Sequence, residues 1–472
     1  MNVLLINPPF VLSEDSPYSK TGAVLPPLGL LYIAAYLRDK HPEFNINVLD
    51  AASYKYNLVD DGFKERLSGF LPDVVGITVY TTTFSAVLKT VEIVKELFPN
   101  CVVVVGGAHV SIKPEECLDY NGIDVAVIGE GEITFNELVE CLSCNGDLDN
   151  VNNIVYKRDN NKIKTNIDGA TGNLDVIPIP ARDMIDMKLY RPAKGVYKRL
   201  PSANMITARG CPFSCNFCSK NIFGNKARYQ SPENIIKEIE ALQRDYGIRE
   251  IAFNDDSFTL SSKRVELLCD LIVQKKLDLT WNCGTRVNLV NPELLKKMKR
   301  GGCFSIGYGI ESGSPDILKK IQKGITLQNV RDAFKWTKKA GIETRASFIF
   351  GLPGETKKTI QQTIDFSLEL DADFVIYNIA IPLPGTKIYD EAKAKNLLLY
   401  DGLELYERAD GPHPLIKLSD VTSEELVQLY NSAYRKYYIR PKYIFNQFKR
   451  IRSLKELNRY VSGFVSFLKW FK

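Results

Sequence analysis

The chain has 472 residues, more than a single hydrophobic core usually holds, so we expect two or three domains. Hydrophobic residues make up 45% and charged residues 25%, which is the composition of a soluble globular protein, and no apolar run is long enough to span a membrane. The net charge of +5 is uneven, because residues 435–472 contain eleven Lys or Arg and one acid. This tail therefore carries +10 and the rest of the chain −5.

The N-terminal residues 1–9 lack the basic region and the cleavage site of a signal peptide, and they predict a strand instead. Ten cysteines without an export signal favour a reducing cytoplasm, where thiols are free to bind metal. Cys141 and Cys144 form a C-x-x-C pair at an expected helix end, where an auxiliary metal site stays open as an alternative.

Residues 1–145 alternate short β-branched apolar runs with helical segments, which predicts a doubly wound parallel sheet of the Rossmann-like kind. Strands are expected at 3–6, 46–49, 74–79, 101–105 and 125–128, with helices over 28–38 and 84–98. In such a sheet, ligands bind at the carboxyl ends of the strands.

Two glycine motifs follow predicted strands of this domain, Gly106-Gly107 and Gly129-Glu130-Gly131-Glu132. Glycine lets a ligand approach the backbone closely, although a tight turn explains each motif equally well on its own. Three further motifs accompany them in order, at residues 7–9, 26–30 and 114–116. Together they resemble the cobalamin-binding domain that precedes many radical S-adenosylmethionine (SAM) domains. The resemblance implies that Gly106, Gly107 and Glu130 border cobalamin.

The motifs depart from many cobalamin proteins in one respect. Those proteins carry D-x-H-x-x-G after the first strand, with the His on cobalt, and the first loop here has no His. We therefore expect cobalamin to bind without a protein imidazole on its lower face. His109 is expected near the nucleotide tail of the cofactor rather than on cobalt.

Residues 146–200 are expected to form a hairpin and an extended linker, because an alternating, Asn- and Asp-rich stretch at 152–167 is followed by Ile177-Pro178-Ile179-Pro180. The alternation of strands and helices then resumes, so the next domain is assigned to residues 201–394.

A cysteine motif follows the first strand of this second domain. Cys211, Cys215 and Cys218 are spaced so that one loop can wrap around a small cluster. A 4Fe-4S cluster has four irons, and electron-transfer ferredoxins normally bind all four through Cys. Three cysteines leave one iron open, which suggests chemistry rather than electron storage. Zinc fits less well, because structural zinc sites take four protein ligands and no His or fourth Cys lies nearby.

This C-x-x-x-C-x-aromatic-C pattern resembles the radical SAM superfamily. The resemblance implies that the open iron binds the amino and carboxylate groups of SAM. One electron, from a donor such as flavodoxin or ferredoxin, then cleaves SAM to a 5′-deoxyadenosyl radical. The three cysteines become the catalytic and metal-binding residues.

Six predicted βα units over residues 201–394 form a partial (β/α)6 TIM barrel, whose chemistry is expected at the C-terminal ends of the strands. The resemblance implies SAM-binding roles for Phe217 beside the cluster, Asp255 and Asp256 at the amino group, Glu311 at the ribose and Ile349 beside adenine. Arg286 ends the third strand. Each acid alone is also explained by capping a helix or pairing with Lys.

Residues 395–472 lose this alternation and predict a C-terminal helical domain. Beyond residue 440, apolar residues recur at helical spacing among Lys and Arg, which is typical of interfacial helices. Two interpretations stay open: peripheral attachment to the inner face of the membrane, or packing of the apolar stripe on the barrel. Nucleic-acid binding is not expected, because the body is acidic and the tail is rich in apolar and aromatic residues.

The whole pattern resembles cobalamin-dependent (class B) radical SAM enzymes, which points first to an anaerobic methyltransferase. It would use a 4Fe-4S cluster, SAM and cobalamin to methylate an unactivated carbon of a hydrophobic or lipid-like small molecule. A radical SAM enzyme that forms rings or C–C bonds, with a catalytic or vestigial cobalamin domain, is the alternative. A cobalamin- or redox-responsive sensor is the non-enzymatic alternative, which the open iron argues against.

Overall fold

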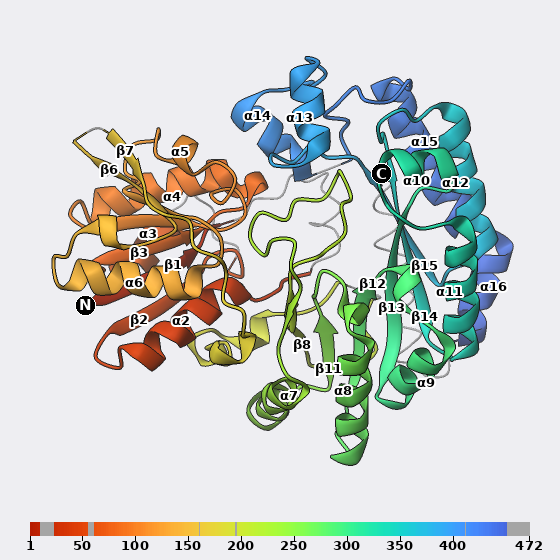
Figure 1. Ribbon diagram of the computed structural model, residues 1–472, viewed down its shortest axis with the longest axis horizontal. Helices are drawn as coiled ribbons and strands as arrows, with labels where there is room; N and C mark the ends of the chain where they lie inside the picture. Colours follow the sequence, from red (N-terminus) through yellow and green to blue (C-terminus); the bar gives the residue numbers. More distant parts are fainter. Residues whose placement is uncertain (10–22, 55–60, 160, 194–195, 411, 451–472) are drawn as a thin grey trace.

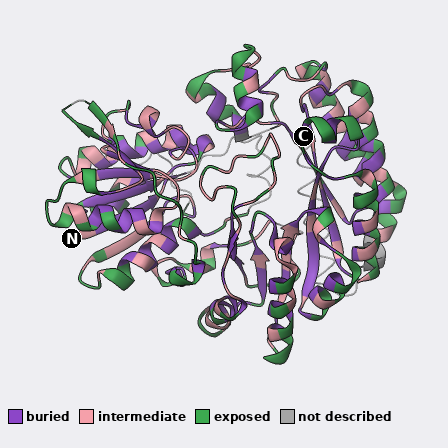
Figure 2. Cartoon of the chain, in the orientation of Figure 1, coloured by how far each residue is buried: buried purple, intermediate pink, exposed green. Residues whose placement is uncertain are grey.

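The computed structural model describes residues 1–9, 23–54, 61–159, 161–193, 196–410 and 412–450. Within them the chain forms an N-terminal sheet domain, an open barrel of parallel strands and a C-terminal group of helices (Figure 1). The fold class predicted from the sequence is confirmed. Figure 2 shows that the strands of both sheets are largely buried, whereas the outer faces of the surrounding helices are exposed.

The first sheet has the strand order β2-β1-β3-β4-β5-β6-β7. Its strands are β1 (Asn2–Asn7), β2 (Asn45–Asp50), β3 (Val74–Thr78), β4 (Val102–Gly106), β5 (Val125–Val127), β6 (Ile154–Arg158) and β7 (Asn161–Lys164). Its helices are α2 (Leu28–Lys40), α3 (Asp61–Ser68), α4 (Phe84–Leu97), α5 (Pro114–Cys117) and α6 (Gly131–Ser143).

The first five strands are parallel, and their alternating side chains fill two separate cores. Val3 and Leu5 of β1 pack with residues of α2 and α6 on one face. Leu4 and Ile6 pack with residues of α3 and α4 on the other. Both faces are covered, which is why these strands are continuous apolar runs.

The hairpin predicted within 146–200 belongs to the first sheet. β6 pairs antiparallel with β5, and β7 pairs antiparallel with β6. Ile154, Val155 and Tyr156 of β6 are buried, so the hairpin extends the N-terminal domain to residue 164 before the linker begins.

The barrel is a six-stranded sheet with the order β15-β14-β13-β12-β11-β8, in which every neighbouring pair is parallel. Its strands are β8 (Ser202–Met205), β11 (Glu250–Phe253), β12 (Thr280–Thr285), β13 (Cys303–Glu311), β14 (Glu343–Phe350) and β15 (Phe374–Ile379). Its helices are α7 (Pro232–Tyr246), α8 (Ser262–Gln274), α9 (Pro292–Arg300), α10 (Pro315–Lys320), α11 (Leu327–Lys339) and α12 (Lys357–Leu370). A separate two-stranded ladder joins β9 (Ala208–Arg209) to β10 (Arg228–Tyr229).

The C-terminal helices are α13 (Lys387–Ala394), α14 (Gly402–Glu407), α15 (Ser423–Tyr438) and α16 (Pro441–Arg450). Tyrosines of α15 cover the open edge of the barrel at β15. The Tyr434 hydroxyl accepts from the N–H of Tyr377 at 3.1 Å and donates to its carbonyl at 3.0 Å. Tyr438 does the same with Val375, at 3.0 and 2.7 Å.

The spacing of these hydroxyls explains the fit. Four residues of a helix rise about 6 Å and two residues of a strand about 6.6 Å, so tyrosines four apart match strand positions two apart.

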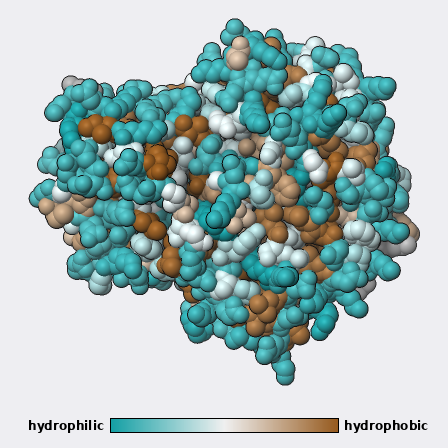
Figure 3. Space-filling model, viewed as in Figure 1, coloured by the Kyte–Doolittle hydropathy of each residue, from teal (hydrophilic) through white to brown (hydrophobic). Residues whose placement is uncertain are grey.

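The C-terminal helices contact both domains, because α14 packs Leu405 and Tyr406 into the core of the first domain. None of the described helices is long and apolar enough to cross a membrane. The face seen in Figure 3 is mainly hydrophilic, with hydrophobic side chains in scattered groups.

Candidate active site

The three cysteines of the predicted cluster motif lie in one loop, residues 210–227, which the β9–β10 ladder closes at its base. Gly210 enters the loop at a φ of +89°, and a Cβ there would collide with the carbonyl oxygen of Lys226. Only glycine fits this position without rearrangement. Within the loop, the backbone N–H of Cys218 donates to the carbonyl of Cys215 at 3.3 Å.

The three thiols, all at least partly accessible, suit a 4Fe-4S cluster better than a single ion. Among the described residues, no three His, Cys, Asp or Glu side chains are placed to hold one metal ion. In a 4Fe-4S cluster each thiolate binds a different iron, so the thiols need not converge on one point. Partial removal of water from around the Cys218 thiol raises its pKa to about 11, and the negative charges of Cys215 and Cys211 add to this shift. Iron would oppose this shift, because metal ligation requires the thiolate.

A buried arginine reaches this loop from the end of β12. Arg286 Nη1 donates to Sγ of Cys215 at 3.4 Å, and the guanidinium lies 3.9 Å from the centre of the Phe213 ring. Its other amino group donates to the carbonyl of Lys323. A positive charge at this distance stabilises a thiolate. The position of Arg286 at the end of a predicted strand was the only sequence signal that pointed to this residue.

Asp255, the first of two aspartates after β11, is hydrogen-bonded to neighbouring elements of the barrel. Its fully buried carboxylate accepts from the N–H of Thr207 at 2.5 Å, the Thr207 hydroxyl at 2.7 Å and the N–H of Ala208 at 3.0 Å. Arg264 donates to it at 3.3 Å. Four donors occupy both oxygens, so this carboxylate fastens the end of β8 to β11.

Asp256, the second aspartate, is exposed and lies at the entrance of the cluster loop. Its carboxylate accepts from the backbone N–H of Gly210. Partial removal of water from around the Asp256 carboxyl raises its pKa above the usual value, and the nearby charge of Asp255 adds to the shift. Of the two predicted SAM-binding aspartates, Asp256 is the one whose carboxylate is open to a ligand.

Glu311 and Phe217 are connected through Lys323. Glu311, at the end of β13, adopts a φ of +73° and accepts from Nζ of Lys323 at 2.6 Å, and both side chains are buried. The Lys323 ammonium lies 5.8 Å from the centre of the Phe217 ring. A continuous set of contacts therefore runs from the β13 end to the cluster loop. Lys323 was not predicted, because it lies in a turn with no distinctive pattern.

Ile349 lies on the inner face of the barrel. Residues of β14 alternate between buried and partly exposed, and Ile349 belongs to the partly exposed set with Arg345 and Ser347. Arg345 donates to Asn282 of β12 at 2.8 Å, so this set faces the interior of the curved sheet. Ile349 is nearest the carboxyl end, and its role beside adenine stays a prediction.

The glycine motifs of the first domain lie at the carboxyl edge of its sheet. Gly107 has a φ of +113°, and a Cβ there would lie 2.9 Å from the carbonyl oxygen of Val79, so tight packing explains this glycine. Gly129 has a φ of +80° and open space around it. Gly106, the last residue of β4, and Gly129, just after β5, thus border a part of the edge with room for a ligand.

No imidazole is available at this edge among the described residues. His109 is buried between the rings of Phe84 and Tyr406, with centroids at 4.5 and 5.0 Å. Burial lowers its pKa to about 4, so it is neutral. His109 therefore packs in the core instead of facing a cofactor, and binding of cobalamin without a protein imidazole on cobalt stays a prediction.

Glu130 joins the two domains. Its carboxylate pairs with Arg209 at 2.6 Å and with Arg228, and Arg209 also pairs with Glu132 at 2.6 Å. All four side chains are at least nine-tenths buried. Arg209 and Arg228 belong to β9 and β10, so the base of the cluster loop is bonded directly to the predicted cobalamin edge. We call these four residues the arginine bridge.

Two family models match the chain. The radical SAM superfamily matches residues 205–367, and the B12 binding domain matches residues 18–139. An uncharacterized methyltransferase of Pyrococcus horikoshii is 39% identical over 445 residues, covering 94% of this chain and 93% of the relative. An anaerobic magnesium-protoporphyrin IX monomethyl ester cyclase of Rubrivivax gelatinosus is 27% identical, covering 99% of this chain and 82% of its own length.

A solved structure shares the fold. The radical SAM methyltransferase TsrM of Kitasatospora setae, with cobalamin and a 4Fe-4S cluster bound, has a TM-score of 0.71 at 20% identity and covers 93% of this chain and 89% of its own. The chain is therefore an enzyme with a radical SAM domain and a B12-binding domain. It belongs to the family of cobalamin-dependent radical SAM methyltransferases, which confirms the predicted family and cofactor set.

Proposed function

We propose that this enzyme methylates an unactivated carbon of a hydrophobic or lipid-like molecule. When bound, the cluster and SAM supply a radical able to remove a substrate hydrogen, and cobalamin supplies the methyl group. The observation that supports the proposal is the arginine bridge, which holds the cluster loop against the carboxyl edge of the first sheet. The group that removes the substrate hydrogen, at the cluster loop, and the group that delivers the methyl, at the carboxyl edge of the first sheet, must both reach the same substrate carbon, so the two sites have to lie close together.

The residues of the chain have separate tasks in this proposal. Cys211, Cys215 and Cys218 bind the cluster, and Arg286 stabilises the neighbouring thiolate charge. Asp256 holds the ammonium group of SAM, because its carboxylate is exposed beside the loop. The buried Lys323–Glu311 pair orients the ligand next to Phe217, and the arginine bridge fixes the two edges relative to each other.

The test is an anaerobic incubation with SAM labelled in its methyl group, followed by extraction of lipid and aqueous products. Label in the lipid fraction, accompanied by 5′-deoxyadenosine, is expected. Label in an aqueous product other than SAM and the methionine released by its cleavage would exclude the lipid-like substrate and keep methyl transfer.

A second candidate function is formation of a ring or a C–C bond. It is favoured by the similarity to the Rubrivivax cyclase along almost the whole chain. In the same incubation it predicts 5′-deoxyadenosine without any transfer of label. The non-enzymatic sensor is set aside by the family of the chain.

Peripheral membrane association is proposed only for the end of the tail. Residues 451–472, which carry most of the predicted amphipathic stripe, lie outside the described residues. In α16, Tyr443 is buried and donates to the carbonyl of Asp373 at 3.1 Å; just before this helix, Arg440 pairs with Asp371 at 2.6 Å. The first turn of the segment therefore packs on the barrel, which supports the alternative interpretation for this turn alone, and Phe445 beyond it is 58% exposed.

Liposome sedimentation tests this association. The full chain should bind vesicles with acidic lipid at low salt, because each Lys or Arg near an anionic surface contributes about 1 kcal/mol. A chain ended after Arg450 keeps the contacts of Tyr443 and serves as the control. Equal sedimentation of the two chains would remove the membrane proposal and favour a soluble substrate.

A further inference from the structure

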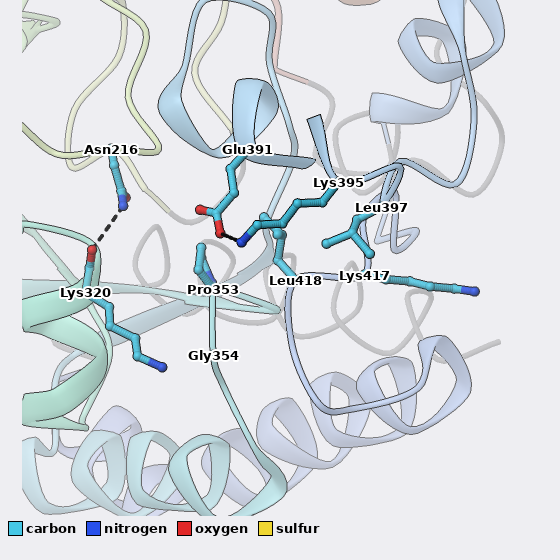
Figure 4. Close-up of a pocket in the computed structure, with 9 residues that line it drawn as sticks. All are labelled: Asn216, Lys320, Pro353, Gly354, Glu391, Lys395, Leu397, Lys417 and Leu418. Atoms are coloured by element: carbon cyan, nitrogen blue, oxygen red, sulfur yellow. Dashed lines mark hydrogen bonds and ion pairs between the residues drawn. The ribbon is translucent and has the colours of Figure 1, made fainter. Parts of the chain in front are cut away.

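A pocket of about 370 Å³ borders the outer side of the cluster loop (Figure 4). Its lining comes from the cluster loop, from the end of α10, from the turn after β14, from α13 and the segment after it, and from the segment that precedes α15. The charged residues among them are Lys320, Lys395, Lys417 and Glu391. We call it the lysine pocket.

The wall nearest the cluster is Asn216, which lies between Cys215 and Phe217 in the sequence. Its N–H donates to the carbonyl of Ile321 at 3.2 Å, and its carbonyl accepts from Ile388 at 3.2 Å. Its side-chain amide donates to the carbonyl of Lys320 at 3.0 Å. Asn216 is therefore clamped between α10 and α13, and a molecule in the pocket lies one residue from a cluster ligand.

The pocket is positively charged. Lys395 pairs with Glu391 at 2.7 Å, whereas Lys320 and Lys417 make no ion pair within the described residues. Gly354, at a φ of +72°, leaves room for the Lys320 ammonium, since a Cβ there would collide with Nζ. Two exposed cations thus remain available to an acidic partner.

The other sides of the cluster loop are already in use. The arginine bridge holds its base against the first domain, and Asp256 and the Lys323–Glu311 pair lie on the side assigned to SAM. Cleavage of SAM consumes one electron, which has to enter from outside the protein. The Asn216 side is an approach to the loop that this set of contacts leaves open, and it borders the residue next to Cys215.

We propose that the lysine pocket is the docking surface of an acidic electron-carrier protein of the flavodoxin kind. The reduced flavin of the carrier loses one electron and the cluster gains it, and no covalent bond forms between the proteins. Lys320 and Lys417 attract carboxylates of the carrier, which raises the rate of encounter rather than the driving force. The inference rests on the proposed cluster but not on methyl transfer.

The experiment measures the rate of cluster reduction in the anaerobic holoenzyme, with fully reduced flavodoxin as the probe. The double variant Lys320→Glu/Lys417→Glu is compared with Lys335→Glu/Lys339→Glu, which makes the same charge change at two exposed positions of α11. The pocket variant should be reduced at least about tenfold more slowly at low salt, and the difference should shrink at high salt. The α11 variant should match the wild type.

Two further arms separate docking from damage. Reduced methyl viologen, a small cation that needs no docking surface, should reduce the pocket variant no more slowly than the wild type. The neutral variant Lys320→Gln/Lys417→Gln should show an intermediate loss with flavodoxin. Equal flavodoxin rates for the pocket and α11 variants, or equal slowing with methyl viologen, would overturn the proposal. Loss of methyl transfer with normal reduction would count against the proposed function alone.

Discussion

Replacing Cys211, Cys215 and Cys218 together by Ala should abolish the cluster, because it removes all three of the thiolates proposed to bind iron. Anaerobic reconstitution followed by iron analysis should give background iron and no cleavage of SAM. The matched control is Cys141→Ala/Cys144→Ala, which should keep about four irons per chain. Iron retained by the triple variant and lost by the control would reassign the cluster to the first domain.

Glu355, in the turn after β14, has a buried carboxyl group that accepts from the N–H of Leu352 at 3.0 Å. Burial raises its pKa from 4.5 to about 8. The unfolded chain loses this proton at lower pH than the folded chain does. The protonated Glu355 therefore contributes fully to the unfolding free energy below about pH 4.5, and this contribution is lost as the pH rises to about 8.

Glu355→Gln should flatten this pH dependence, because Gln imitates the protonated acid. Each unit of pKa difference corresponds to about 1.4 kcal/mol in unfolding free energy per proton. Thermal unfolding midpoints at pH 5.5 and 8 should differ less in the variant than in the wild type. The same difference in both proteins would show that Glu355 ionises normally.

At the scale of secondary-structure elements, the barrel edge depends on two hydroxyl groups of α15. Tyr434→Phe/Tyr438→Phe keeps the rings and removes both hydroxyls, leaving the N–H and carbonyl groups of Tyr377 and Val375 without these partners. Each buried group left unsatisfied costs about 1–3 kcal/mol. We expect a clear fall in the thermal midpoint and faster hydrogen exchange at β15.

Tyr36→Phe is the control for this edge, because the Tyr36 hydroxyl makes no hydrogen bond within the described residues. Its thermal midpoint should stay close to that of the wild type. If the α15 double variant were as stable as this control, water would replace the tyrosine hydroxyls adequately, and the apolar packing of α15 would be the main cover of the edge.

At the scale of the whole molecule, the arginine bridge couples the two cofactor-binding domains. Glu130→Gln leaves Arg209 and Arg228 without the shared carboxylate, and breaking a buried ion pair costs about 3–5 kcal/mol. We expect faster proteolysis in the linker after residue 164 and weaker retention of cobalamin. Glu140→Gln, at an exposed position of α6, which begins just after Glu130, should change neither. Unchanged proteolysis of Glu130→Gln would mean that other contacts hold the domains together.

Much of the architecture could be predicted from local pattern. The apolar runs of the first domain and the six βα units of the barrel are periodic, and the five strands expected in the first domain lie close to β1, β2, β3, β4 and β5. The cysteine motif is equally local, because the three ligands lie within eight residues of one loop. Such features depend on neighbours in the sequence, so no knowledge of distant contacts is required.

The distinction between neighbouring acids could not be predicted in this way. Asp255 and Asp256 are adjacent and chemically identical, yet one is enclosed by Thr207 and Arg264 and the other is open. The carboxylate of Glu130 is bonded to two arginines about 80 and 100 residues away, which the sequence did not predict, and its contact with cobalamin stays a prediction. Each partner comes from another element, and burial decides whether an acid serves the fold or a ligand.

By itself the sequence indicated the family, the succession of strands and helices along the chain and the cysteines of the cluster loop, because these follow from motifs and periodicity. Only the tertiary structure decided which side of the cluster loop meets the first domain, which carboxylates remain open and how the last strand is covered. These outcomes depend on side chains that meet across large sequence separations, such as Arg209 with Glu130 and Tyr438 with Val375. Local patterns do not encode such pairings, since a tyrosine or arginine suits many partners until packing selects one.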